Sequence, residues 1–448
     1  MATIAAGLTL RTLGHACLAL YQDPENPLLV TDPWLVGSVY WRSWWLENYP
    51  SAEEIDWLGK TAFVYVTHEH PDHFHMPSIR RLGSGPTYLF PSLAEQGYLD
   101  HMDRHGFHAE SVVPLHWREI ADGIWLMSVP AWNDDSVLLV DTPNALILNL
   151  NDAKPLKPVL RAIRRVADRS RKPRILLCSY SPASVINSFL DDSGIVTLKL
   201  AQHYVDYVCR LCELLAVDTY MPFASQAVFN RLDSRWANDY RTTYRHLEEY
   251  WRSHTRLLPP YTTLDLKDFS YRSIAPERYR PGQKSILDLH TGHRSAEEET
   301  AAISAEDIAA LERKLNAFRW LLPLILPRGF AFRLGERCFH YNAWRGRLIE
   351  VDPSTGQYGD FIVTVPKLTL KEALRNDHLT DLGITMFVRI RLLRRIDPRK
   401  AYALFVLFQF DDYGHLRSPA ALLRWLWRGV KFTFALRLPV VPSPTAKR

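Results

Sequence analysis

The chain has 448 residues, of which 47% are hydrophobic, and its formal net charge is only +5. A chain of this length and composition can bury a large core and is expected to form more than one domain. It has no uninterrupted apolar run of about 18 residues, which argues against a membrane span. The five cysteines form no disulfide framework, and no basic region followed by an apolar run opens the chain, so we expect a reducing, cytoplasmic location without a secretory leader.

Short apolar segments bounded by Gly, Pro or Asp predict strands through the first 180 residues, with helices between and after them. The pattern favours an α+β fold. The expected strands are residues 8–11, 18–21, 28–31, 63–67, 87–90, 124–129, 137–140, 146–150 and 175–179. The expected helices are residues 77–81, 156–170, 199–215 and 233–253.

A histidine-rich segment, Thr67-His68-Glu69-His70-Pro71-Asp72-His73, follows one of the expected strands. Alternate side chains of a strand point to one face, so His68 and His70 would converge on one ion. The turn at Pro71 would bring Asp72 and His73 toward a second position. Imidazole and carboxylate suit zinc, iron or manganese. The segment therefore predicts one or two divalent metal ions, and the alternative is a solvated histidine-rich turn.

This motif resembles that of the metallo-β-lactamase superfamily. Residues 13–20 are similar to the opening strand of its phosphodiesterase and lactonase branches, and Val30-Thr31-Asp32-Pro33-Trp34 is similar to its first aspartate motif. The resemblance implies an αββα sandwich of two sheets, with helices outside and metals at the sheet edge. It also implies that Asp32 orients a metal-bound histidine and that Asp152 is a metal ligand. Asp72 and Asp32 are the catalytic residues that it indicates.

A narrower resemblance rests on three segments. Residues 32–37, the Trp44-Trp45-Leu46 segment and residues 220–225 look like the catalytic domain of the CMP-N-acetylneuraminate hydroxylase branch. That branch implies an iron oxygenase that receives electrons from a Rieske cluster. The aromatic residues would either wall a substrate pocket or form a packed loop.

Two departures from these families matter. The third histidine motif should follow residues 124–129, where this chain has Pro130-Ala131-Trp132-Asn133-Asp134-Asp135. Either Asp134 or Asn133 coordinates instead, and Asp134 would favour iron or manganese over zinc, or one metal position is weakened. His116 is a less favoured substitute upstream. The second departure is that the five cysteines cannot supply the paired Cys and His ligands of a Rieske centre.

A polar passage at residues 290–300 marks the expected end of a metal-binding domain, residues 1–290. Residues 301–448 are expected to form a small C-terminal α/β appendage. We expect it to hold a helix that opens at Ser304, strands at residues 360–366, 384–390 and 405–410, and a helix at residues 369–374.

The C-terminal tail is basic, because the last sixty residues carry 13 Lys and Arg against three Asp. Residues 420–434 mix Leu and Trp with Arg and Lys at helical spacing. This helix either lies on an anionic membrane surface, as a peripheral contact, or packs its tryptophans on the domain, and packing is the favoured interpretation. No nucleic-acid module accompanies the charge, so we expect no nucleic acid partner.

Three functions follow as hypotheses. In the favoured one, a hydroxide generated at the metal hydrolyses an ester, phosphodiester or amide of a small polar or anionic metabolite. In the second, the ion is iron and the protein is an oxygenase that receives electrons from a separate electron-transfer protein. In the third, the altered histidine motif has cost activity, and the chain is a metal-poor binding or scaffold protein.

Overall fold

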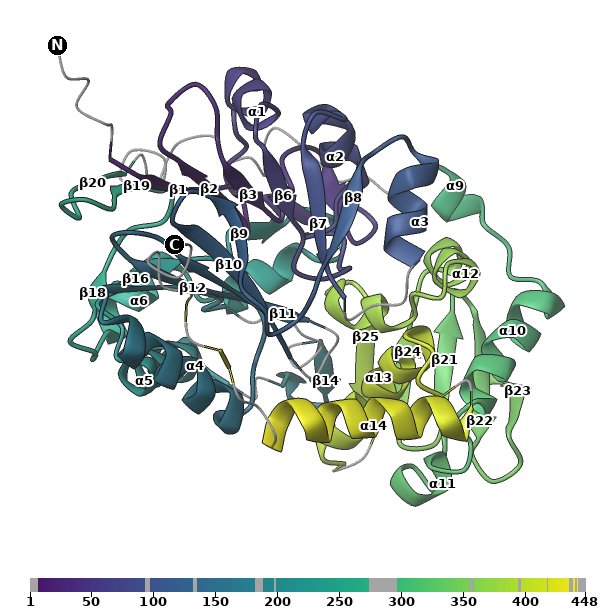
Figure 1. Ribbon diagram of the computed structural model, residues 1–448. Helices are drawn as coiled ribbons and strands as arrows, with labels where there is room; N and C mark the ends of the chain where they lie inside the picture. The colour runs from purple at the N-terminus through teal and green to yellow at the C-terminus, as the bar shows by residue number, and fades with distance from the viewer. Residues whose placement is uncertain are drawn as a thin grey trace, which may run out of the picture.

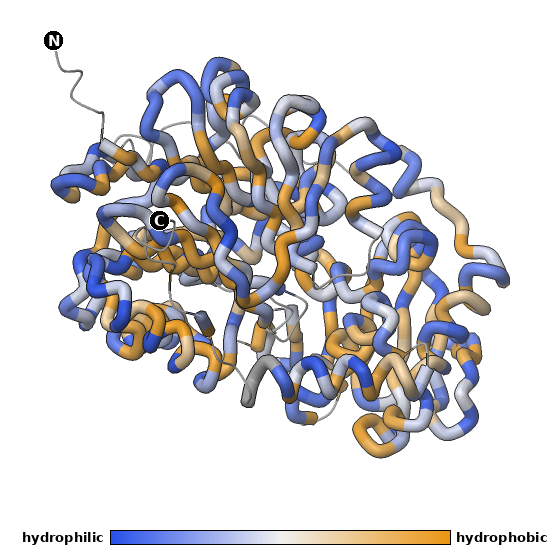
Figure 2. The backbone as a smooth tube through the Cα atoms, viewed as in Figure 1, coloured by the Kyte–Doolittle hydropathy of each residue, from blue (hydrophilic) through white to orange (hydrophobic). Residues whose placement is uncertain are grey.

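Two β-sheets packed face to face, with helices on both outer faces, form the larger part of the protein (Figure 1). Hydrophobic residues concentrate along the inner strands, and hydrophilic residues concentrate on the surrounding loops (Figure 2). The computed structural model describes residues 7–92, 97–131, 135–181, 188–196, 199–273, 296–353, 356, 358–393, 396–416, 418–434, 438–439 and 441.

The first sheet has eight strands in the order β20-β19-β1-β2-β3-β6-β7-β8. Its strands β3, β6, β7 and β8 run parallel, so their carboxyl ends meet at one edge. The bounds are β1 (Thr9–Leu13), β2 (Cys17–Tyr21), β3 (Leu29–Thr31), β6 (Phe63–Tyr65), β7 (Thr87–Pro91), β8 (Ala109–Val112), β19 (Thr262–Asp265) and β20 (Tyr271–Ser273).

The second sheet has seven strands in the order β18-β16-β13-β12-β11-β10-β9. Every residue of β11 and β12 is buried, because this sheet is covered on both faces. The bounds are β9 (Arg118–Ala121), β10 (Ile124–Pro130), β11 (Ser136–Asp141), β12 (Leu146–Asn151), β13 (Arg174–Cys178), β16 (Thr219–Pro222) and β18 (Arg256–Leu257).

Three hydrophobic layers hold this sandwich together. Leu18 and Tyr65 of the first sheet pack against Leu138 and Ile147 of the second in the layer between them. Helices α1 (Ala52–Leu58), α2 (Met76–Leu82) and α3 (Gly97–Arg104) cover the outer face of the first sheet. Helices α4 (Lys157–Ser170), α5 (Ala201–Leu215) and α6 (Tyr244–Tyr250) cover the second. The expected α+β class and αββα sandwich are confirmed.

A third sheet has the order β15-β14-β25-β24-β21-β22-β23 and its own core. Strand β14, from the middle of the chain, pairs in parallel with β25, so the sandwich contributes strands to this C-terminal sheet. The boundary between the two domains was expected at residues 290–300, and residues 290–295 of that passage lie outside the residues that the structure describes. The bounds are β14 (Phe189–Asp191), β15 (Gly194–Ile195), β21 (Phe330–Leu334), β22 (Arg337–Asn342), β23 (Arg347–Val351), β24 (Phe361–Thr364) and β25 (Arg389–Leu392).

The helices of this part surround the third sheet, and α14 runs along the lower edge of the molecule in Figure 1. Within the described residues, no helix combines the length and apolarity that crossing a bilayer requires. A small sheet of β4 (Ser38–Val39), β5 (Trp44–Leu46) and β17 (Ala227–Phe229) lies beside the sandwich. The helices are α9 (Ala296–Thr300), α10 (Ala305–Asn316), α11 (Leu322–Ile325), α12 (Lys367–Arg375), η4 (Thr380–Ile384), α13 (Pro398–Asp412) and α14 (Pro419–Phe434).

Three expected elements are wrong. Residues 405–410 lie inside α13 and not in a strand, because Pro398 and the Asp397 cap start a helix there. The strand expected at residues 384–390 begins only at Arg389, since η4 occupies the preceding turn. The helix expected at residues 233–253 is broken into η2 (Arg235–Tyr240) and α6, which Thr243 caps separately.

Candidate metal centre

The carboxyl ends of two parallel strands bring the first part of the site together. Asp32 follows β3, and Thr67 follows the neighbouring strand β6. The Asp32 carboxylate accepts hydrogen bonds from the Thr67 backbone N–H at 2.7 Å and from the Thr67 hydroxyl at 2.8 Å. The loop that carries the histidines is therefore fixed at its first residue.

Asp32 also orients one of those histidines. Its Oδ2 lies 3.0 Å from His73 Nδ1, and both side chains are fully buried. An imidazole whose Nδ1 is bound to a carboxylate keeps Nε2 available as a donor to a metal. The structure thus places Asp32 behind His73, and His73 Nε2 becomes the central donor atom of the site.

On one side of His73 lie His68 and Asp152, and we call this group of three the open side. His73 Nε2 is 3.6 Å from Asp152 Oδ1, and His68 Nε2 is 3.8 Å from the same oxygen. His73 Nε2 and Asp152 Oδ1 are buried and have no hydrogen-bond partner among the residues that the structure describes. Two imidazoles and a carboxylate whose ligand atoms lie within 4.8 Å of one another fit a divalent cation.

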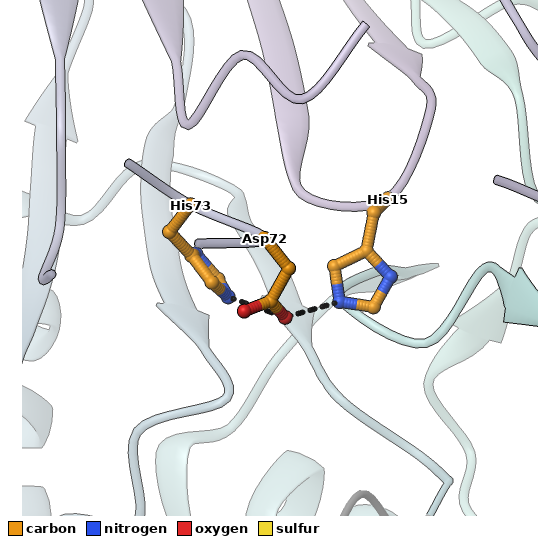
Figure 3. Close-up of side chains that lie close together, drawn as sticks. All are labelled: His15, Asp72 and His73. Atoms are coloured by element: carbon orange, nitrogen blue, oxygen red, sulfur yellow. Dashed lines mark ion pairs between the residues drawn. The ribbon is translucent and has the colours of Figure 1, made fainter. Parts of the chain in front are cut away.

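On the other side of His73 lie Asp72 and His15, and we call this group of three the sealed side (Figure 3). Asp72 Oδ2 is 3.3 Å from His15 Nε2 and 3.6 Å from His73 Nε2. The hydroxyl of Tyr40 donates to Asp72 Oδ1 at 2.5 Å. All four side chains are buried, so this side also offers a metal ligand set, but without direct access from solvent.

His70 belongs to neither group of three. Its Nδ1 is 2.8 Å from His68 Nε2, so one of the two nitrogens donates a hydrogen bond to the other. Its Nε2 faces the hydroxyl of Tyr413 at 3.5 Å. His70 therefore links the open side to the C-terminal part of the chain.

The third-motif residues Asn133 and Asp134 lie outside the described residues, and Asp134 as a ligand stays a prediction. The next residue, Asp135, contacts the site instead, with Oδ1 3.4 Å from His68 Nδ1. Burial, followed by the charge of Asp152, raises the pKa of Asp135 well above its usual value. His116 is exposed and hydrogen-bonds to the Pro114 carbonyl, outside both groups.

Sequence reasoning missed His15, Tyr40 and Asp135. His15 occupies the turn between β1 and β2, which is tight because Gly14 has φ +53° and a Cβ there would lie 3.0 Å from the Trp34 carbonyl oxygen. The Gly-His pair at a hairpin turn was the available signal. Asp135 could have been found from its place directly before the buried strand β11.

The loop that carries Tyr40 is strained and held from outside the sandwich. Tyr40, Trp41 and Arg42 all have positive φ, at 51°, 52° and 64°. Such a conformation persists only where surrounding contacts impose it. The Trp41 indole donates to Glu372 Oε2 at 2.8 Å, and the Trp44 indole donates to the Ile384 carbonyl at 2.9 Å. The C-terminal part therefore helps to place Tyr40 against Asp72.

Three carboxylates concentrate negative charge around His73. Burial, the largest influence, lowers the pKa of His73, but Asp152, Asp72 and Asp32 outweigh it and raise that pKa to about 10. Burial, with His73 beside it, lowers the pKa of His68 well below its usual value. Without an ion, the carboxylates therefore hold positive charge on His73 itself, whereas His68 is a neutral imidazole, which is the form that binds metals.

Two cavities meet at the open side. A cavity of about 740 Å³ is lined by His68, by aromatic residues that include Tyr98 and Trp425, and by Arg104, Arg424 and Arg428. A cavity of about 180 Å³ is lined by His68, His70, Asp135, Asp152 and residues of α13. The open side is thus reached through space that the C-terminal helices partly enclose.

No protein-family model matches this chain. Its sequence is similar to cytidine monophosphate-N-acetylneuraminic acid hydroxylases. The enzyme from Xenopus laevis is 28% identical over 150 residues, which cover 31% of this chain and 25% of that enzyme. The enzyme from Cricetulus griseus is 36% identical over 150 residues, which cover 31% of this chain and 26% of that enzyme. The chain therefore matches about a quarter of the length of these relatives.

Among solved structures, a possible metal-dependent hydrolase from Veillonella parvula aligns with 58% of this chain and 100% of its own. The identity is 12% and the TM-score is 0.42. At this score the likeness says nothing about chemistry.

Proposed function

We propose that this chain is a metal-dependent hydrolase of the metallo-β-lactamase-fold superfamily and that it acts on a small anionic metabolite. The observation that carries the proposal is the open side, where His73 Nε2 and Asp152 Oδ1 face each other at 3.6 Å without hydrogen-bond partners among the described residues. Buried polar atoms are nearly always paired, so this arrangement fits a cation between them. A divalent ion held by His68, His73 and Asp152 would lower the pKa of water and polarise the group under attack.

The chain's own residues hold and orient this centre. Asp32 fixes the ring of His73 through Nδ1. Although burial favours its neutral form, Asp72 has a pKa well below its usual range, because His73 and His15 stabilise the carboxylate. Asp72 therefore contributes a full negative charge toward His73, and this charge helps to retain a cation at the centre.

The larger cavity indicates the charge of the substrate. Arg104 of α3 and Arg424 and Arg428 of α14 line it from two separate elements, while Trp425 and Tyr98 provide aromatic surface. Guanidinium groups recognise phosphate and carboxylate, and aromatic rings can stack on a flat group. We therefore infer an anionic substrate of metabolite size whose ester, phosphodiester or amide bond lies near His68.

A second candidate function is hydroxylation. Two histidines and one carboxylate with open positions are the ligands of many non-haem iron oxygenases, and the open side has this composition. The sequence relatives are named as hydroxylases. In this case a separate electron-transfer protein would supply the electrons.

The test is to purify the protein without chelators, load it with Zn²⁺, Mn²⁺ or Fe²⁺, and assay two reactions. Hydrolysis is followed with an aryl phosphodiester and a lactone, and oxygen uptake is followed with a chemical reductant. We expect metal-dependent hydrolysis that Asp152→Asn abolishes. The matched control Asp168→Asn, at an exposed carboxylate on α4, should leave hydrolysis unchanged.

Metal-dependent oxygen uptake without hydrolysis would instead support the second candidate. Protein that retains none of the three metals would contradict both and favour a binding or scaffold role. For the substrate charge, Arg104→Gln should raise KM for anionic substrates while kcat changes little.

A further inference from the structure

Helix α14 presents an apolar stripe that no described residue covers. Leu423 is 65% exposed, Leu426 41%, Trp427 71% and Val430 44%. The other three positions lie three, four and seven residues after Leu423, so the four share one face of the helix. A contiguous exposed apolar face on a helix is a typical contact surface.

The opposite face of α14 is fixed to the protein. The Trp425 ring contacts Phe410 with centroids 4.8 Å apart and His415 with centroids 5.3 Å apart. Trp425 and Arg428 also line the larger cavity. Trp425 therefore packs on the protein while Trp427 is exposed, and the apolar stripe faces away from the core.

The charge around the stripe selects one kind of partner. Helix α14 carries Arg424, Arg428 and Lys431 and no acidic residue. From residue 413 to residue 448 the sequence holds seven Lys and Arg and no Asp or Glu. A second copy of this helix would meet like charge, whereas anionic lipid headgroups would meet opposite charge.

We propose that α14 docks the protein on the surface of an anionic lipid bilayer. The stripe of Leu423, Leu426, Trp427 and Val430 lies in the boundary between headgroups and acyl chains, and Lys431 beside it binds the headgroups. The helix lies in the plane of the surface, because it is amphipathic. The sequence left packing and membrane contact as alternatives for this helix, and the structure shows one face that packs and one that is exposed.

The experiment is co-sedimentation of the full-length protein with vesicles of phosphatidylcholine alone or of phosphatidylcholine mixed with phosphatidylserine. We expect binding to the mixed vesicles only, and less binding at high salt. Trp427→Glu and Leu423→Glu should each abolish binding. Lys431→Gln should weaken it about fivefold, since one cation near the surface contributes about 1 kcal/mol.

The matched control is Tyr271→Glu, which places the same carboxylate at an exposed aromatic position on β20, far from α14 in Figure 1. It should bind the mixed vesicles as the unchanged protein does. The proposal is overturned if the unchanged protein stays in solution with mixed vesicles, or if the two stripe variants bind as well as Tyr271→Glu. It is also overturned if the protein is a dimer that both stripe variants convert to a monomer without any vesicle binding.

Discussion

The two sides of His73 use similar residues in different surroundings. On the open side, Asp152 is 26% exposed at its side chain and borders a cavity. On the sealed side, Asp72 and His15 are 5% and 2% exposed, and the Tyr40 hydroxyl covers the remaining oxygen of Asp72. One imidazole therefore separates a position that can exchange ligands from one that is closed. Ligand type alone therefore does not identify the reactive position, whereas access from solvent does.

The largest effect is expected from His73→Asn, which removes the donor that both sides share. Both groups would lose a ligand, and Asp32 and Asp72 would keep buried charge without their partner. We expect loss of bound metal and of the metal's contribution to stability, which is about 2.7 kcal/mol when the metal is present at a hundred times its dissociation constant. Elemental analysis and chemical denaturation with and without chelator measure this. If the variant kept its full metal content, His73 would not be a metal ligand.

The next comparison changes one carboxylate on each side. Asp152→Asn should remove metal-dependent activity and lower metal affinity by at least about tenfold. Asp72→Asn should also lower the metal content, but only by the amount of metal that is bound on the sealed side. Titration of each apoprotein with metal, followed by calorimetry, separates the two. Equal behaviour of both variants would mean that the two sides act as one site.

The wall of the larger cavity contains a carboxyl group, Asp412, whose contribution to stability should depend on pH. Burial raises the pKa of Asp412 to about 7, so the folded protein holds a proton that the unfolded chain releases near pH 4. Stability from this group is therefore highest below about pH 4 and falls as pH rises from about 4 to about 7. Between pH 5 and pH 8 we expect Asp412 to account for a loss of about 2.7 kcal/mol, which Asp412→Asn lacks. Urea denaturation of both proteins at the two pH values is the measurement.

The smallest effect is expected from Tyr40→Phe, which deletes only the hydroxyl that seals Asp72. A hydrogen bond to a charged group contributes about 1.5 kcal/mol to stability. We expect a loss of that size, with metal on the open side unchanged. A matched variant is Tyr49→Phe, whose hydroxyl bonds the Leu46 N–H and the Gly37 carbonyl, which carry no net charge, and this variant should cost less. If Tyr40→Phe empties the open side, the two sides are not separate.

Much of the sandwich was predictable because its strands have clear apolar patterns and sharp turns. The β6 strand and the histidine-rich loop after it could be read locally, and the Asp32 motif follows β3 in the same way. Buried helix and buried strand have similar patterns over short runs, which is why residues 405–410 were assigned wrongly.

The rest of the site depends on contacts that no local pattern encodes. His15 reaches Asp72 from a hairpin far earlier in the chain, and Tyr40 reaches it only because three residues adopt positive φ. Strand β14 joins the C-terminal sheet across about two hundred residues, as its pairing of Phe189 with Ile390 shows. Such pairings are set by tertiary packing, so a single sequence does not reveal them.

The loop around Tyr40 has a consequence for how the protein is made. Trp41 is held by Glu372, which lies 331 positions later in the chain. At about 5 to 20 residues per second, roughly 15 to 70 s of synthesis separate the two residues. During that interval the strained loop lacks the partner that holds it over Asp72. We expect the sealed side to reach its final arrangement only after Glu372 has been made and can hold Trp41.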